Sequence, residues 1–427
     1  MKQILTLMIL TLGSVAWGQR VTDSAWRADV KTVTLTRGGV ELEAPVLTMG
    51  AGERMLLQFD VLADEAENLR YTIAHCDADW RRDDLEPYEF MNGFEGGEIE
   101  NVEFSFTTLR NYIHYHQMVP AKYAEFIHSG NYVVTVTDTE GDTLLTRRFW
   151  VSEQAVGVEA TMERPYDGAD LLKRQEIDVI IEAQQTASQS VQVRQEYERV
   201  LVQQNGRLDN QRWLEFSGYD GRNLAYRYRQ SNIFDGGNTF RFFDCSNLRA
   251  PMYNIVRIEE YGGEVFAMVR PEEDRSKKHF LQSDKTLNGG MKVNVWDRQN
   301  KALQADYVWV NISLPMAQPW LDKSVYIVGQ LTDWKLDSAS RMEYKPEYKA
   351  YVKRLLLKQG YYSYQLLCTP SPLRGTPPMV GGELGPSATE TLEGDHWEMP
   401  NNYTIFVYHR EPSDRADRLV AVRRIQQ

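Results

Sequence analysis

Residue types that bind metal ions gather in two short segments of this chain. They are His75, Cys76, Asp77 and Asp79 in the first segment and His114 and His116 in the second. On a strand, His114 and His116 would share one face, because alternate side chains point the same way. Such ligands suit zinc, but a common site would require the two segments to converge. We favour the alternative, in which these side chains pack and hydrogen-bond, and predict no metal and no cofactor.

Carboxylates are concentrated in the same region. They are Asp77, Asp79, Asp83, Asp84 and Glu86. Paired carboxylates are the catalytic groups of glycoside hydrolases, but the neighbouring Arg81 and Arg82 favour a simpler interpretation as a solvated, charge-balanced loop. The sequence contains no G-x-S-x-G, phosphate-binding loop or dinucleotide fingerprint. We therefore predict that the protein is not an enzyme, and keep a glycoside hydrolase as the less favoured alternative.

Two motifs near the C-terminus resemble early-set, immunoglobulin-like modules that bind starch or glycogen. Gly329-Gln-Leu-Thr-Asp-Trp334 is similar to their G-x-[FL]-[NT]-x-W turn, and Leu357-Lys-Gln-Gly-Tyr-Tyr-Ser-Tyr364 is similar to one of their strands. The same positions build the fold of such modules, so we expect Trp334 to serve packing. A periplasmic glycan-binding protein remains an alternative function.

Strand patterns must position these groups along most of the chain. Residues 30–36, 54–61, 132–137 and 143–151 read as strands, and the turn at 138–142 joins the last two as a hairpin. Short strands separated by Gly and Asp turns are typical of β-sandwiches. We therefore predict an all-β fold of tandem immunoglobulin-like β-sandwich domains.

Two to four domains are expected, because the chain is too long for a single hydrophobic core. We assign the N-terminal β-sandwich to residues 20–155, a middle β-rich domain to 156–315, and a C-terminal early-set immunoglobulin-like domain to 320–427. Pro315 and Pro319 favour an extended linker between the last two. The Gly- and Pro-rich stretch at 376–387 is predicted to be a loop.

The N-terminus resembles a secretory signal. Lys2 precedes an apolar stretch at residues 4–12, and Ala16 and Gly18 are the small residues that a signal peptidase reads. We predict a signal peptide at residues 1–18, with cleavage between Gly18 and Gln19. The apolar stretch is too short to cross a bilayer.

The net charge limits the kinds of partner that the protein can bind, and the cysteine content limits its disulfides. With 48 basic and 60 acidic residues, the formal net charge is −12. We expect no nucleic-acid partner, because phosphate contacts dominate such binding. After the N-terminus no stretch has the length of a membrane span, so the protein is not expected to span a membrane. Cys76, Cys245 and Cys368 are too few for a disulfide framework and are predicted to be buried, although one long-range disulfide is an open alternative.

Several motifs together resemble the type IX secretion system plug protein family. They are His75-Cys76-Asp77-Ala-Asp-Trp80, the step Gly93-Phe94, the segment from Ser105 to Tyr115, Ser129-Gly-Asn-Tyr132 and the Trp334 module. The resemblance covers nearly all of the chain after the signal. It implies a non-enzymatic periplasmic protein, held at the outer membrane by its partner. Such plugs are expected to close the periplasmic end of the large β-barrel translocon.

The resemblance supplies no active-site residues, so the partner-binding residues are a separate hypothesis. Tyr and Trp are enriched in binding hot spots. We therefore expect contact with the translocon through the aromatic part of the first domain, at Trp80, Tyr112, His114, Tyr115 and His116. The competing interpretation is that Trp80 and Tyr115 are core residues of the sandwich.

Overall fold

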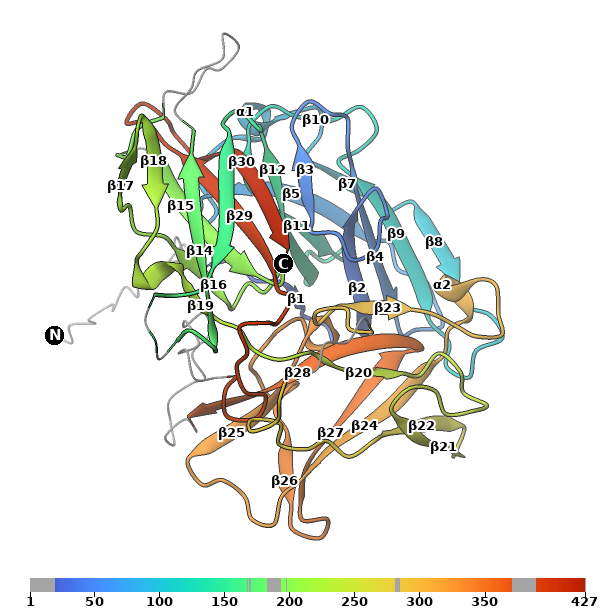
Figure 1. The fold of residues 1–427 in the computed structure, drawn as a ribbon. Coiled ribbons are helices and arrows are strands. Elements are labelled where there is room, and N and C mark those ends of the chain that lie inside the picture. Colours follow the sequence, from blue (N-terminus) through green and yellow to red (C-terminus); the bar gives the residue numbers. More distant parts are fainter. Residues whose placement is uncertain are drawn as a thin grey trace, which may run out of the picture.

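The structure is a computed structural model that describes residues 20–166, 168, 170–182, 193–196, 198–280, 285–370 and 389–426. The predicted signal peptide, with Gly18 and Gln19 at its cleavage point, and the predicted loop at 376–387 lie outside the described residues. The regular elements of the described chain are nearly all β-strands, arranged as three β-sandwiches (Figure 1). The predicted all-β class of tandem sandwiches is confirmed.

The first sandwich uses the N-terminal part of the chain. Its strands are β1 (Ser24–Ala25), β2 (Val30–Arg37), β3 (Val46–Thr48), β4 (Met55–Val61), β5 (Arg70–Cys76), β7 (Gly96–Glu98), β8 (Asn101–Phe104), β9 (Ile113–Val119), β11 (Gly130–Thr137) and β12 (Thr143–Ser152). One sheet has the order β1-β12-β11-β5-β7, with β3 beside β12, and the other has the order β2-β4-β9-β8. Phe59, Tyr132 and Phe149 fill the core between them.

A small two-stranded sheet closes one end of the first sandwich. It contains β6 (Met91–Asn92) and β10 (Glu125–Phe126), and the short helix α1 (Pro87–Phe90) leads into it. Glu86 and Glu89 form a capping box at the start of α1, which satisfies backbone N–H groups that the helix leaves free. Met91 and Phe126 are paired and point into the core of the first sandwich.

The second sandwich is built from two separated stretches of chain. Its strands are β13 (Val158–Glu163), β14 (Arg174–Ile181), β15 (Glu198–Gln204), β16 (Gln211–Trp213), β17 (Gly218–Asp220), β18 (Asn223–Tyr226), β19 (Ile233–Asp235), β29 (Asn402–His409) and β30 (Arg418–Gln426), with the turn η1 (Gln230–Asn232). One sheet has the order β13-β14-β18-β17, with β19 beside β14, and the other β16-β15-β29-β30. Ile177, Val202 and Val407 lie in the core between them.

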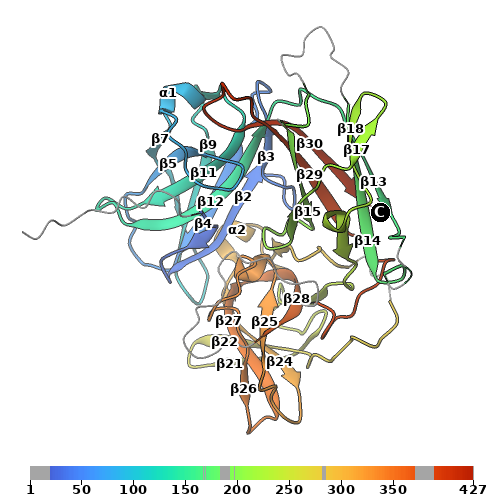
Figure 2. The same ribbon diagram turned by 90° about the vertical axis from the view of Figure 1, so that its left-hand side faces the viewer.

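The third sandwich is inserted between β19 and β29 of the second. Its strands are β20 (Arg241–Asp244), β21 (Ile255–Tyr261), β22 (Glu264–Val269), β23 (Met291–Val293), β24 (Tyr307–Pro315), β25 (Lys323–Val328), β26 (Glu343–Lys345), β27 (Ala350–Lys358) and β28 (Gly360–Pro370), with α2 (Lys301–Gln304) and η2 (Gln330–Thr332). β20 and β23 flank β28, which also pairs with β25, and the facing sheet is β21-β22-β24-β27-β26. In both views it lies below the other two sandwiches (Figures 1 and 2).

The sheets group the strands differently from the predicted boundaries at 156–315 and 320–427. Residues 241–315 belong to the third sandwich, and residues 402–426 return to the second. Pro315 ends β24 and the chain continues into β25 of the same sandwich, so this stretch does not separate domains. The local pattern identifies strands but not their partners, and Leu201 of β15 pairs with the distant Phe406 of β29.

Truncation tests this arrangement. A chain that ends at Pro400 lacks β29 and β30 and therefore loses half of one sheet of the second sandwich, together with the core residues Ile405 and Val407. We expect limited proteolysis, followed by mass spectrometry, to cut rapidly within residues 156–235 of the truncated chain. Cleavage of this region at the rate of the full chain would contradict the observed topology.

Candidate functional site

The outer face of the first sandwich is covered by the second through an aromatic cluster. Trp80 and Trp150 of the first sandwich lie against Phe406 and Tyr408 of β29. The Trp80 ring meets Trp150 edge-on with centroids 5.1 Å apart, and Trp150 stacks on Phe406 at 4.8 Å. Trp80 retains only 2% of its accessible surface. This side chain therefore joins two sandwiches inside the protein.

Hydrogen bonds fix the same interface. The Trp150 indole N–H donates to the Tyr408 hydroxyl at 3.2 Å, and that hydroxyl donates to Asn131 at 2.7 Å. The Asn131 amide in turn donates to the carbonyl of Asp77 at 2.9 Å. The backbone N–H of Ala78 donates to the Asp417 carboxylate at 2.8 Å. These bonds satisfy polar groups that would otherwise be buried at a cost of about 1–3 kcal/mol each.

Carboxylates of the predicted cluster form hydrogen bonds within the loop at residues 77–83 and with His75. Asp77 accepts the backbone N–H groups of Asp79 and Arg81, and burial raises the pKa of Asp77. The Asp83 carboxylate bonds the His75 ring, whose other nitrogen lies 3.1 Å from the carbonyl of Ser129. The described geometry of these groups therefore matches the favoured interpretation of a charge-balanced loop.

A buried charged cluster joins the first sandwich to the third. The Asp60 carboxylate of β4 lies 2.6 Å from the Lys358 ammonium of β27 and accepts a hydrogen bond from the Tyr307 hydroxyl at 2.7 Å. His114 contacts the other carboxylate oxygen at 2.7 Å. Tyr112 places its ring 4.1 Å from the Lys358 ammonium and donates its hydroxyl proton to the carbonyl of Ala302. Two of the predicted site residues thus belong to this interface.

The charges in this cluster depend on one another. Burial alone would raise the pKa of Asp60, but the Lys358 ammonium and the His114 side chain outweigh it, so that the pKa of Asp60 is lowered. Burial lowers the pKa of Lys358, against the opposing effect of Asp60. Desolvation of either group is expensive unless its partner stays in place. Separation of the two sandwiches would therefore expose these charges to water or leave each one without its partner.

Further polar contacts join the first sandwich to the third. Arg147 of β12 forms an ion pair with Asp333 at 2.8 Å, and Lys335 donates to the Ser24 hydroxyl at 2.7 Å. Arg298 of the third sandwich donates to the carbonyl of Thr107 in the first at 2.6 Å. The first and third sandwiches are thus held at several points along their contact.

The remaining predicted site residues take different places. Tyr115 is buried in the core of the first sandwich, where its ring stacks on Phe59 with centroids 5.2 Å apart. His116 is partly exposed and lies 3.5 Å from Glu103.

Burial therefore corrects the hypothesis that these residues contact the translocon. Trp80, Tyr112, His114 and Tyr115 are buried, and a buried side chain offers no surface to a partner. The competing interpretation of Tyr115 as a core residue is correct. His116 alone keeps some access to solvent, and its role in partner binding remains a prediction.

The proposed metal ligands do not form a common site. His75 and His114 engage different carboxylates, Asp83 and Asp60, on opposite sheets of the first sandwich. Within the residues that the structure describes, no group of three or more His, Cys, Asp or Glu side chains is arranged to hold an ion.

The cysteines are buried thiols. Cys76, Cys245 and Cys368 are free, and burial raises the pKa of each to about 12. Cys76 lies in the cluster between the first and second sandwiches, and Cys245 and Cys368 lie in the core of the third. All three act as small apolar groups, as predicted.

Trp334 packs at the junction of the second and third sandwiches. Its ring meets Phe240 edge-on at 6.2 Å, and the Arg207 guanidinium lies 5.2 Å from its centroid. A Cβ added to Gly289 would come within 2.2 Å of the ring. This is the packing role that was expected for Trp334.

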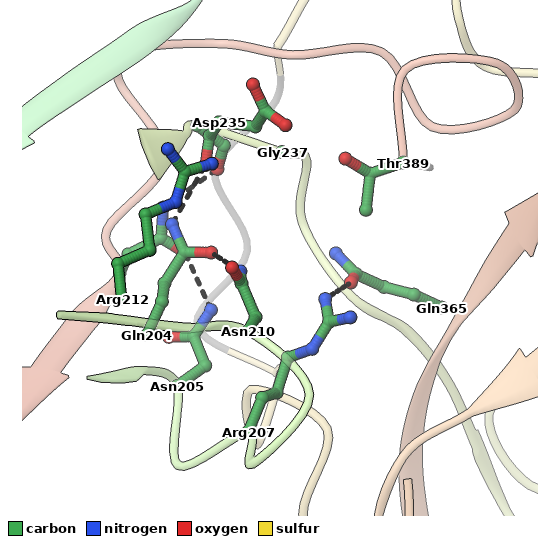
Figure 3. A pocket seen from close by; sticks show the side chains of 11 residues that line it. Gln204, Asn205, Arg207, Asn210, Arg212, Asp235, Gly237, Gln365 and Thr389 are labelled. Atoms are coloured by element: carbon green, nitrogen blue, oxygen red, sulfur yellow. Dashed lines mark hydrogen bonds between the residues drawn. The ribbon is translucent and has the colours of Figure 1, made fainter. Parts of the chain in front are cut away.

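A small polar pocket lies at the same junction (Figure 3). Its walls include Gln204, Asn205, Arg207, Asn210, Gln365 and Asn401. The groups are largely paired with one another, since Asn210 donates to Gln204 at 2.6 Å and Arg207 donates to Gln365 at 3.5 Å (Figure 3). The cavity volume is about 30 Å³, whereas one water needs about 10–15 Å³. The pocket has room for water.

Sequence reasoning missed the residues that hold the sandwiches together. Asp60, Lys358 and Tyr307 form the buried charged cluster, and Asn131 and Tyr408 bond across the first and second sandwiches. One signal was present, because Asp60 stands between Phe59 and Val61 within a predicted strand, and Lys358 directly follows the three leucines at residues 355–357. Their pairing depends on three-dimensional contact and is not visible in the sequence.

Comparison with known proteins identifies the first domain. Residues 30–153 match the family model described as the type 9 secretion system plug protein 1st domain. Residues 30–153, which we call the plug domain, are therefore similar to this family. The plug domain contains both faces described above, the one that contacts the second sandwich and the one that contacts the third.

Nearly the whole chain is also similar to solved structures, among them a hypothetical protein from Parabacteroides merdae. The two share 27% identity with a TM-score of 0.87, over 96% of this chain and 100% of that chain. No protein in the curated set matches this chain. The similarity extends beyond the plug domain and covers the second and third sandwiches. Among the described residues of the plug-domain protein, no helix is long and apolar enough to cross a membrane.

Substitution of Lys358 tests the buried cluster. Lys358→Met leaves the Asp60 carboxylate buried without its cation, so we expect the free energy of unfolding to fall by about 3–5 kcal/mol. The double variant Asp60→Asn/Lys358→Met removes both charges and should recover much of the loss. Chemical denaturation measures both effects.

The matched control is Lys301→Met, which breaks the exposed ion pair of Lys301 with Glu41 at the same interface. This change should alter stability by no more than about 1 kcal/mol. Equal losses for Lys301→Met and Lys358→Met would show that the buried position of Lys358 has no special role.

The pKa of Asp395, at the junction beside the pocket, predicts how the stability of the fold depends on pH. Burial, and then the nearby Asp235 carboxylate, raise the pKa of Asp395 to about 7. Between about pH 4 and this value the folded chain holds a proton that the unfolded chain releases, so this group lowers stability as the pH rises. Asp395→Asn keeps an acceptor for the N–H of Gly237 and removes the charge. We expect its stabilisation relative to wild type to grow from about pH 4 to 7 in thermal unfolding.

The exposed Asp142 provides the control. Asp142→Asn should show the wild-type pH profile. Parallel profiles for Asp395→Asn and wild type across this window would contradict the assignment to Asp395.

Proposed function

We propose that this protein is a non-enzymatic plug that closes the periplasmic end of the type IX secretion translocon in the outer membrane. The observation that carries the proposal is the match of residues 30–153 to the plug protein family. The partner is a large outer-membrane β-barrel, and the plug is periplasmic, held near the membrane by that barrel. The acidic chain has no part in binding nucleic acid.

The physical requirement of this role is a body that keeps its shape. A wide pore is closed only if the stopper does not deform or separate into loosely tethered domains. Each of the three sandwiches contacts the other two, through the aromatic cluster, the buried Asp60–Lys358 pair and the junction around Trp334. Interfaces with buried charges and packed aromatic rings resist relative motion of domains, unlike the small polar contacts usual between domains of one chain. This rigidity supports the proposed role.

Deletion of the gene tests the proposal. An idle barrel without its plug should admit large solutes, so we expect faster uptake of a large antibiotic that the intact outer membrane excludes. The control strain lacks both the plug and the barrel and should show the parental low permeability. Unchanged permeability in the plug deletion, with the barrel shown to be present, would contradict the proposed function.

A further inference from the structure

Large aromatic side chains point outward from the small sheet at the end of the first sandwich. We call Tyr88 of α1, Phe94 after β6 and Tyr123 before β10 the aromatic tip. Their exposed fractions are 74%, 81% and 89%. Both views place α1 at the end of the molecule farthest from the third sandwich (Figures 1 and 2).

The sheet pairing brings together two of the segments that carry these rings. Asn92 lies opposite Glu125, and the next pair along the two strands is Gly93 and Ala124. A Cβ added to Gly93 would come within 3.0 Å of Ala124, and Gly93 has a φ of +108°, which favours glycine. The segments that carry Phe94 and Tyr123 are therefore in contact through their backbones at Gly93 and Ala124.

The tip is rigidly supported although its rings are exposed. Phe90, Met91 and Phe126 of the same segments are buried in the core of the first sandwich, and the capping box of α1 fixes the entry to the sheet. Exposed aromatic residues scattered singly are ordinary, but several on one supported tip are typical of a binding surface. Aromatic rings with few rotatable bonds are the side chains most enriched at the centre of interfaces.

The charge around the tip indicates the chemistry of its partner. Arg415 pairs with Asp84 and Glu89, so the exposed carboxylates left beside the rings are Glu86 and Glu125, with the half-buried Glu95 nearby. Lys122 lies over the Tyr123 ring at 5.4 Å. It is the one basic residue in the segments 83–95 and 122–127 that carry the tip. An apolar patch with an acidic border fits a surface with apolar side chains flanked by lysine or arginine.

We propose that the aromatic tip docks onto the periplasmic rim of the secretion barrel, at a site with apolar side chains flanked by basic residues. This inference rests on the proposed function and adds the surface through which the plug is held. The tip lies within the residues that match the plug family, and its rings are more exposed than the other exposed aromatic side chains of that domain, Phe104 and Phe106, whereas Trp80, Tyr112 and Tyr115 are buried in it. Docking by the tip leaves the three sandwiches free to act as the stopper.

The test uses the full chain as bait with detergent-solubilised outer membranes, and the barrel is identified by mass spectrometry. The variant is Phe94→Ala/Tyr123→Ala. Loss of two hot-spot rings should reduce retention of the barrel at least about tenfold. The matched control is Tyr219→Ala/Tyr261→Ala, which removes exposed rings from the second and third sandwiches and should retain the barrel as wild type does. All the variants should keep the wild-type melting temperature, because the rings are exposed.

Charge reversal provides an independent arm. Glu125→Lys keeps the rings and the capping box but should weaken retention of the barrel by opposing a basic rim. Wild-type retention by both the aromatic and the charge variants would overturn the docking surface and leave the proposed function standing. A wild-type bait that retains no barrel would overturn the proposed function itself. Light scattering that shows a wild-type dimer, and a monomer for Phe94→Ala/Tyr123→Ala, would assign the tip to self-association instead and overturn the inference.

Discussion

A carboxylate and an ammonium group buried between two domains are stable only while both domain surfaces stay in contact. Asp60 of the first sandwich and Lys358 of the third form such a pair, with Tyr307 and His114 bonded to the same carboxylate. Neither charge reaches water in the assembled protein. Opening this interface would require rehydration of both groups and loss of the hydrogen bonds around them, so the pair couples the position of the third sandwich to the first.

The contact between the first and second sandwiches has the opposite chemistry, because it is largely apolar. β11 contributes Tyr132 to the core of its own sandwich and Val133 to the interface, and β29 alternates in the same way between Val407 and Phe406. Strands buried on both faces lose the polar alternation of a free sheet. The facing sheets of the first and second sandwiches are therefore joined by a continuous apolar layer. Because β29 returns to the second sandwich, the third sandwich is an insertion within the second.

These interfaces account for the division of aromatic residues in the plug domain. Rings that hold the sandwiches together are buried, as Trp80 and Tyr112 are, whereas the rings of the aromatic tip face solvent at the far end of the domain. A stopper with this division keeps its shape through one set of aromatic residues and presents another to its surroundings. The same residue type serves both purposes, and burial distinguishes them.

The sequence by itself determined the all-β class and the similarity to the plug family, because strand alternation, turns and short motifs are local properties. The packing role of Trp334 and the burial of Cys76 could also be predicted, since both follow from residue type and a nearby pattern. Only the tertiary structure decided that β29 joins the second sandwich, that Asp60 meets Lys358, and that Trp80 is buried while Phe94 is exposed. These outcomes depend on contacts between residues far apart in the chain, which no local spacing encodes.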